Sequence, residues 1–134
     1  MKQFISLSEQ DTLKIASDFA KTLKIGDVIA LHGTLGVGKT AFTRGVIQSL
    51  TNAPEVPSPT FTIVQSYDGI THFDLYRVED ADELVEVGLE YAMQNDITLI
   101  EWPEIAEPMM PKDTIHVYIS AYGDGRRVQV MNIC

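Results

Sequence analysis

A glycine-rich segment in the first third of the chain restricts the possible folds more than any other feature. Residues 33–40 read GTLGVGKT, and Gly33, Gly38, Lys39 and Thr40 complete the phosphate-binding loop pattern. Glycines let successive backbone N–H groups point into one concavity for phosphate oxygens, and a helix that begins there adds its N-terminal dipole. The segment follows an apolar run and precedes a predicted helix, so the pattern predicts an α/β nucleotide-binding fold.

Two side chains of this segment have a predicted chemical role. Lys39 is the mobile cation for the β and γ phosphates, and the Thr40 hydroxyl is a hard oxygen ligand for magnesium. Four specified positions recur by chance in roughly one chain of this length in two hundred. The position between a buried strand and a helix makes chance agreement rarer still. The sequence therefore predicts a site for ATP and Mg²⁺.

The other apolar and turn patterns predict a mixed sheet flanked by helices. Two continuous apolar runs are typical of strands buried on both faces of a parallel sheet. Asp68-Gly69 and residues 123–125 are turn sequences between strands and predict antiparallel hairpins. We therefore expect one P-loop NTPase-like α/β domain over residues 1–134, with a parallel centre and antiparallel hairpins. The predicted strands are residues 4–7, 28–31, 61–67, 70–76, 97–100, 114–120 and 127–133.

Three helices are predicted. Ser8 is the N-cap of the first, with Asp11 three residues on, and apolar residues at helical spacing continue to about Lys24. The second covers residues 39–50. The third begins at Asp80 and has on one face Ala81, Leu84, Val85 and Gly88.

Two segments are predicted to be loops, and the first ends in hydroxyl side chains. Residues 52–59 hold three prolines, and a Pro- and Met-rich segment follows residue 101. Ser58 and Thr60 could close over the γ-phosphate and the metal, as switch loops do. They could equally form a turn in which proline fixes the backbone. The sequence leaves both readings open.

Two acidic residues are candidates for the second magnesium ligand that a phosphate-loop enzyme needs. Glu101 ends the apolar run at 97–100, and Asp74 lies in a predicted hairpin strand. The phosphate-loop pattern favours a metal role for Glu101 over an ordinary solvated carboxylate. His32, His72 and His116 show no metal-ligand spacing and are expected to be strand residues.

The composition limits the partners and the compartment. The net charge is −9, from 19 acidic and 10 basic side chains, which disfavours direct binding to a nucleic-acid backbone. Any role near RNA is therefore expected to depend on partner proteins. No apolar run approaches the roughly 20 residues of a membrane helix, and the N-terminus lacks a signal-peptide layout. The single cysteine fits a reducing compartment, so we expect a cytoplasmic protein without a membrane partner.

Taken together, four segments resemble the TsaE (YjeE) family of bacterial P-loop ATPases. They are the phosphate loop, residues 58–61 (SPTF), residues 72–77 (HFDLYR) and residues 101–103 (EWP), in the family's order. The resemblance implies an ATPase that acts on the TsaB–TsaD complex. In that complex, TsaD transfers the threonylcarbamoyl group in making N6-threonylcarbamoyladenosine at position 37 of tRNAs that read codons starting with A. Binding of tRNA would then occur through the complex.

The resemblance also implies roles for individual residues. Thr40 and Glu101 correspond to magnesium ligands, and Asp74 to a residue important for activity, so Lys39, Asp74 and Glu101 are the implied catalytic residues. Glu9 and Arg126 correspond to positions that line the nucleotide away from the phosphates. The implied ATP-binding residues are Glu9, Gly33, Leu35, Gly36, Val37, Gly38, Lys39, Thr40 and Arg126.

Three other functions are considered. A GTPase switch would need an Asn-Lys-x-Asp motif and an Asp-x-x-Gly motif, and neither occurs. A small-molecule kinase usually has an Arg-rich lid, whereas the arginines here are few and scattered. A nucleotide-dependent adaptor without significant turnover stays an alternative, because no arginine finger is identifiable. If the chain is an ATPase, we therefore expect weak intrinsic activity that depends on partners.

Overall fold

Seven strands form a single mixed sheet in the computed structural model, which describes residues 2–33, 38–51 and 64–132. The strand order across the sheet is β1-β7-β6-β2-β5-β4-β3. The strands are β1 (Lys2–Ser6), β2 (Val28–His32), β3 (Val64–Tyr67), β4 (Ile70–Asp74), β5 (Ile97–Glu101), β6 (Ile115–Tyr122) and β7 (Gly125–Asn132). The helices are α1 (Glu9–Ala20), α2 (Lys39–Thr51), α3 (Asp82–Glu86), α4 (Leu89–Asn95) and the 3₁₀ helix η1 (Pro103–Met109).

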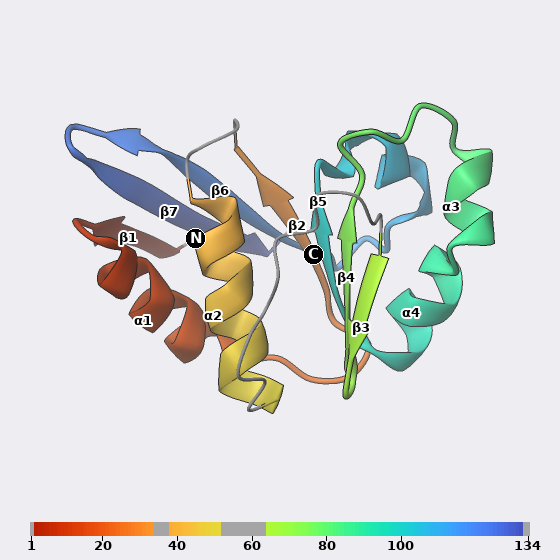
Figure 1. The fold of residues 1–134 in the computed structure, drawn as a ribbon, viewed down its shortest axis with the longest axis horizontal. Helices are drawn as coiled ribbons and strands as arrows, with labels where there is room; N and C mark the ends of the chain where they lie inside the picture. The colour runs from red at the N-terminus through yellow and green to blue at the C-terminus, as the bar shows by residue number, and fades with distance from the viewer. Residues whose placement is uncertain (1, 34–37, 52–63, 133–134) are drawn as a thin grey trace.

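The middle of the sheet is parallel and its two ends are antiparallel (Figure 1). Strand β2 pairs in parallel with β5 and β6, and β5 pairs in parallel with β4. Strands β3 and β7 pair antiparallel with β4 and β6, and β1 pairs antiparallel with β7 at the edge. The predicted α/β fold with a parallel centre and antiparallel hairpins is confirmed.

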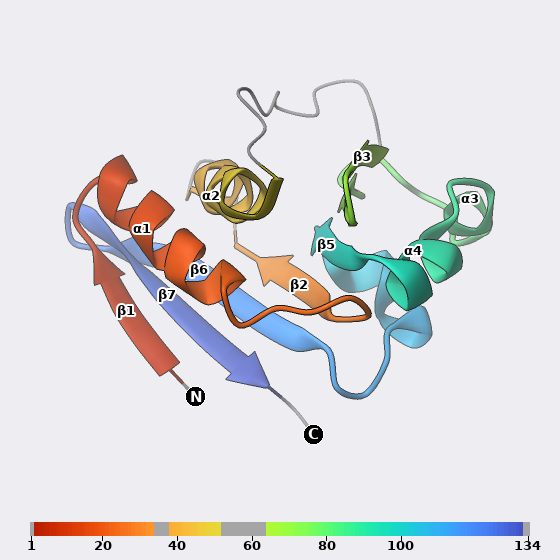
Figure 2. The same ribbon diagram turned by 90° about the horizontal axis from the view of Figure 1, so that it is seen from below.

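The sheet has an apolar core on each face. Helices α1 and α2 lie together on one side of the sheet, while α4 and η1 lie on the other side near β5 (Figure 2). Ile29 and Leu99 pack in the first core with Phe42 of α2, and Val28 and Ile100 pack in the second. Successive strand residues point to opposite faces, so consecutive apolar residues of β2 and β5 fill both cores.

Helix α1 begins as predicted and ends earlier than predicted. The Ser8 hydroxyl accepts from the N–H of Asp11, and the Asp11 carboxylate accepts from the N–H of Leu7 at 2.9 Å. The helix ends at Ala20 instead of near Lys24. The Asp27 carboxylate accepts from both the backbone N–H and the side-chain Nζ of Lys24, at 2.9 and 3.1 Å. These bonds stabilise a turn at residues 24–27, which the spacing of apolar residues in the sequence does not predict.

The third predicted helix is instead two short helices. Asp80 lies before α3, where its carboxylate accepts from the N–H of Asp82 at 2.9 Å. Gly88 adopts a left-handed φ of 79° that ends α3 and precedes α4. Leu84 is buried, but Val85 is 67% exposed, so the predicted apolar face is wrong at Val85. Helix α4 was not predicted from the sequence.

The segments after residues 74 and 101 also differ from the prediction. The Pro- and Met-rich segment after residue 101 contains η1, which Pro103 begins, so it is not an irregular loop. Strand β4 ends at Asp74 because the Asp74 carboxylate accepts from the N–H of Tyr76 in a tight turn. The predicted loop at 52–59 and the strand residues 61–63 lie outside the described residues.

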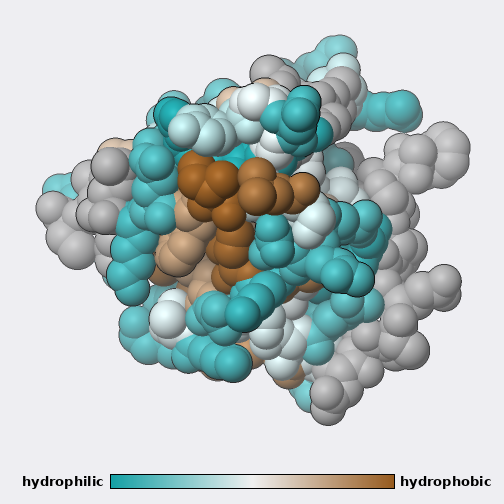
Figure 3. Space-filling model, turned by 90° about the vertical axis from the view of Figure 1, so that its left-hand side faces the viewer, coloured by the Kyte–Doolittle hydropathy of each residue, from teal (hydrophilic) through white to brown (hydrophobic). Residues whose placement is uncertain are grey.

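Apolar side chains are exposed on the edge formed by β1. Figure 3 views the side on which β1, α1 and the β6–β7 hairpin lie in Figure 1, and apolar surface gathers near its centre. The exposed apolar residues of this segment are Phe4, Ile5 and Leu7. None of the helices in residues 2–33, 38–51 and 64–132 is long and apolar enough to span a bilayer.

The contact between α1 and α2 requires a glycine. A Cβ at Gly45 would lie 2.7 Å from the Cβ of Ala16 and 3.1 Å from the carbonyl oxygen of Leu13. We expect Gly45→Ala to lower the free energy of unfolding by about 1–3 kcal/mol through overpacking, although alanine is the better helix former by about 1 kcal/mol. Urea unfolding measures the change.

A second substitution tests whether that clash is the cause. Ala16→Gly removes the opposing Cβ. The substitution should therefore lower the free energy of unfolding less in the Gly45→Ala chain than in the wild-type chain. Strictly additive effects of the two substitutions would contradict the steric explanation.

Candidate functional site

The candidate site lies at the carboxyl ends of the parallel strands, where open α/β sheets bind ligands. Strand β2 leads into Gly33, and α2 begins directly after Gly38. Gly38 has a φ of +102°, a conformation that side chains rarely adopt. Residues 34–37 of the predicted loop lie outside the described part of the chain, and with them the predicted ATP-binding residues Leu35, Gly36 and Val37.

Strands β4 and β5 place two carboxylates side by side. Asp74 and Glu101 are register partners at the ends of these neighbouring strands. Burial raises the pKa of Asp74. The hydrogen bond from the N–H of Tyr76 lowers this pKa and the nearby Glu101 charge raises it, and the net shift is upward. The sheet therefore assembles a half-buried anionic site from the two acidic residues that the sequence singled out.

Glu101 is bonded to a histidine on the neighbouring strand. The Nε2 of His72 lies 2.7 Å from Oε2 of Glu101, and the two side chains are only 2% and 5% exposed. Ile70 and Leu99 of the same strands pack against α2, so the two-residue repeat places His72, Asp74 and Glu101 on that face of the sheet.

Lys39 is buried beside these carboxylates. The residue is 5% exposed, and its Nζ lies 3.5 Å from the centre of the Trp102 ring. Burial lowers the pKa of Lys39, while the charges of Glu101, Asp74 and Glu104 raise it. The Nζ has no hydrogen-bond partner among the described residues. Trp102 has the only positive φ of a non-glycine residue in that part of the chain, 56°, a conformation that bulky residues rarely adopt.

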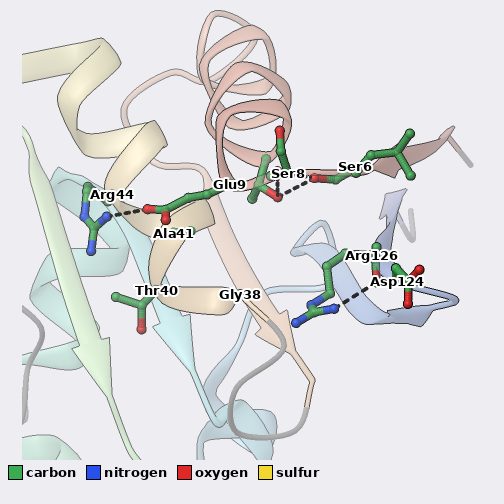
Figure 4. Close-up of a pocket in the computed structure, with 12 residues that line it drawn as sticks. Ser6, Ser8, Glu9, Gly38, Thr40, Ala41, Arg44, Asp124 and Arg126 are labelled. Atoms are coloured by element: carbon green, nitrogen blue, oxygen red, sulfur yellow. Dashed lines mark hydrogen bonds and ion pairs between the residues drawn. The ribbon is translucent and has the colours of Figure 1, made fainter.

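A pocket of about 400 Å³ opens next to the start of α2. Glu9 of α1 and Arg126 of the β6–β7 hairpin line it together with Gly38 and Thr40 (Figure 4). The structure thus brings Glu9 and Arg126, the first and last of the predicted site residues in sequence, to one pocket. Arg44 of α2 points toward Glu9, and the two form a salt bridge of 3.0 Å.

Two site residues were missed by the sequence analysis. Arg44 lies one helical turn after Thr40, a spacing that places both on one face of α2 and could have identified it. His72 was expected only as a strand residue, which it is, but its bond to Glu101 depends on strand order. Ser58 and Thr60 lie outside the described residues.

The side chains that could bind a metal here are of the kind that binds magnesium together with a nucleotide. Within the described ranges, no three His, Cys, Asp or Glu side chains group closely enough to hold a metal by themselves. Mg²⁺ usually binds through one or two carboxylates together with substrate phosphates and water. The two adjacent carboxylates of β4 and β5 are of the residue type that such a site needs.

The other histidines form a separate cluster. His32 Nε2 lies 2.9 Å from His116 Nδ1, and the His32 ring stacks on Tyr118 with centroids 4.4 Å apart. Burial lowers the pKa of His32, and the neighbouring His116 lowers it further. Both histidines are strand residues, as expected from the sequence.

Known proteins resemble this chain over most of its length. The profile of the family described as "Threonylcarbamoyl adenosine biosynthesis protein TsaE" matches residues 6–128. A tRNA threonylcarbamoyladenosine biosynthesis protein TsaE of Rickettsia bellii is 40% identical over 131 residues, covering 94% of this chain and 91% of that protein. The Bacillus subtilis protein of the same name is 39% identical over 127 residues, covering 91% and 79%.

The fold also matches a solved structure. The crystal structure of Bacillus subtilis YdiB has a TM-score of 0.79 and 28% sequence identity with this chain. The match covers 99% of this chain and 86% of that one.

Proposed function

This chain belongs to the TsaE family of threonylcarbamoyl adenosine biosynthesis proteins, and from that membership we propose that it is a magnesium-dependent P-loop ATPase. Its role would be in forming N6-threonylcarbamoyladenosine at position 37 of tRNAs reading codons that start with A. The observation that carries the proposal is the placement of Lys39, a residue of the phosphate-loop pattern, beside Asp74 and Glu101.

The proposed roles follow from the chemistry of each side chain. Lys39 and the loop glycines bind the phosphates, and the Thr40 hydroxyl and the Glu101 carboxylate hold magnesium. The bound metal would neutralise charge on the phosphates. Asp74 is half-buried and has a raised pKa, which suits a carboxylate that accepts a proton from the attacking water. Glu9 and Arg126 line the pocket for the part of ATP beyond the phosphates.

The proposed partners are the TsaB and TsaD proteins, in the cytoplasm, with tRNA reached through that complex. Contiguous exposed apolar patches are uncommon on monomeric proteins and often mark a protein interface. Leu7 is 74% exposed and also lines the pocket, so the apolar patch of Phe4, Ile5 and Leu7 adjoins the site. A partner that covers this patch would lie next to the bound nucleotide.

Nucleotide choice provides the direct test of the proposed site. We expect ATP and ADP to bind with Mg²⁺, and GTP to bind distinctly more weakly, because the chain lacks the guanine-recognition motif. Isothermal titration calorimetry with each nucleotide measures the affinities. Equal affinity for GTP would overturn the adenine assignment, and no binding of any nucleotide would overturn the site.

A nucleotide-dependent adaptor is the second candidate. One observation favours it: Lys39 is held over Trp102 without a hydrogen-bond partner among the described residues, so the resting site is not arranged for catalysis. Nucleotide binding without phosphate release, both alone and with TsaB and TsaD, would identify the adaptor.

A further inference from the structure

The bond between His72 and Glu101 controls how one carboxylate can face the nucleotide site. Glu101 ends β5, and a glutamate side chain can rotate about several single bonds. His72 Nε2 contacts Oε2 of Glu101 at 2.7 Å from the neighbouring strand. That contact occupies one carboxylate oxygen and restricts the rotation, so the other oxygen, Oε1, is the one left to face a cation.

The second ring nitrogen of His72 indicates the direction of the bond. Nδ1 is buried and has no partner among the described residues. An N–H group buried without an acceptor is more costly than a lone pair left unpaired. The favoured tautomer therefore has its proton on Nε2 and donates it to Glu101.

We propose that His72 is a positioning residue that orients the Glu101 carboxylate for the Mg²⁺ bound with the nucleotide. This rests on the proposed function. Hydrogen-bond partners of metal-binding side chains fix the orientation of those ligands, and their loss typically costs 10–100-fold in metal affinity. His72 has the geometry of such a partner, since both side chains are almost fully buried and belong to adjacent, rigidly paired strands.

The test separates metal binding from nucleotide binding. His72→Leu removes the donor, and ADP affinity is measured by calorimetry over a range of Mg²⁺ concentrations and again with EDTA. We expect the apparent Mg²⁺ affinity to fall 10–100-fold, while ADP affinity in EDTA stays at the wild-type value. Glu101→Gln should show the same pattern, because it weakens the metal ligand directly.

Two further variants keep the test informative if His72→Leu does not fold. His72→Gln places a donor near the position of Nε2 and should restore most of the Mg²⁺ response. His72→Asn has a shorter side chain, which places its amide near the position of Nδ1, and should not restore it. Thermal melting of each variant shows which are folded.

The possible outcomes distinguish the two proposals. Equal losses of ADP affinity with Mg²⁺ and with EDTA would show that His72 only supports the structure. A wild-type Mg²⁺ response in folded His72→Leu or His72→Asn would also overturn the positioning role. If the wild-type chain itself binds ADP without any dependence on Mg²⁺, the proposed magnesium site fails first.

Discussion

ATP hydrolysis by the isolated chain is expected to be slow, and addition of TsaB and TsaD is expected to raise the rate by about 10³–10⁵. Phosphoryl transfer depends on charge stabilisation in the transition state, and an arginine finger supplies a rate increase of this size. Arg44 is held in a salt bridge with Glu9 at the pocket, and Arg127 lies over the Tyr122 ring. A partner could therefore supply the missing charge.

The partner could also act by moving Lys39. In the free chain its Nζ lies over the Trp102 ring, 3.5 Å from the centre. Nucleotide binding would move Lys39 from this position toward the phosphates. A partner that favours the nucleotide-bound position shifts the equilibrium between the two positions, and by linkage it then binds the ATP and ADP forms with different affinities.

Phosphate release measured with the chain alone, with each partner and with both tests this prediction. The Lys39→Ala chain mixed with both partners is the control for contaminating ATPases. A fast rate of the chain alone that both partners leave unchanged would exclude the mechanism.

Lys39→Ala should weaken ATP binding by about tenfold or more while the chain stays folded. Losing a charged hydrogen-bond partner costs roughly 1.5–3 kcal/mol. The fold should tolerate the change, because Lys39 is a buried cation whose pKa is lowered by burial, and it forms no hydrogen bond within the described residues. Calorimetric affinity and thermal melting measure the two effects.

Two further variants isolate the role of the charge. Lys39→Met keeps the aliphatic chain against Trp102 and should lose ATP affinity as Lys39→Ala does, with less change in packing. Lys14→Met on the exposed side of α1 removes a lysine from the surface and should leave ATP affinity unchanged. An unaltered dissociation constant in folded Lys39→Ala would show that the phosphates bind elsewhere.

The sheet was predictable because its strands carry local patterns. The apolar runs of β2 and β5 reflect burial on two faces, and the Asp68-Gly69 turn specifies the β3–β4 hairpin. Helix ends were less predictable, since they depend on single side chains. The carboxylate of Asp27 holds the turn after α1, and Gly88 divides one predicted helix into two.

The sequence names candidate site residues one by one but does not predict their geometry. Lys39 and Thr40 belong to a local pattern, Glu101 ends a recognisable apolar strand, and Asp74 lies in a predicted hairpin strand. Their proximity follows from strand order, which no local pattern contains. For the same reason, the sequence does not predict the bond between His72 and Glu101. Glu9 and Arg126 came from family resemblance alone, and their shared pocket is a long-range property of the fold.

The pairing of β1 with β7 has a consequence for the order of folding. Ser6 pairs with Arg126 and Lys2 with Val130, so this ladder joins segments almost the whole chain apart. Contacts this distant in sequence close a large loop and tend to form late. Arg126 of the pocket wall belongs to β7, and Glu9 begins α1, which follows β1 closely in sequence. On the ribosome, α2 emerges long before β7 is synthesised, so the nascent chain should acquire the complete pocket only after β7 has been made.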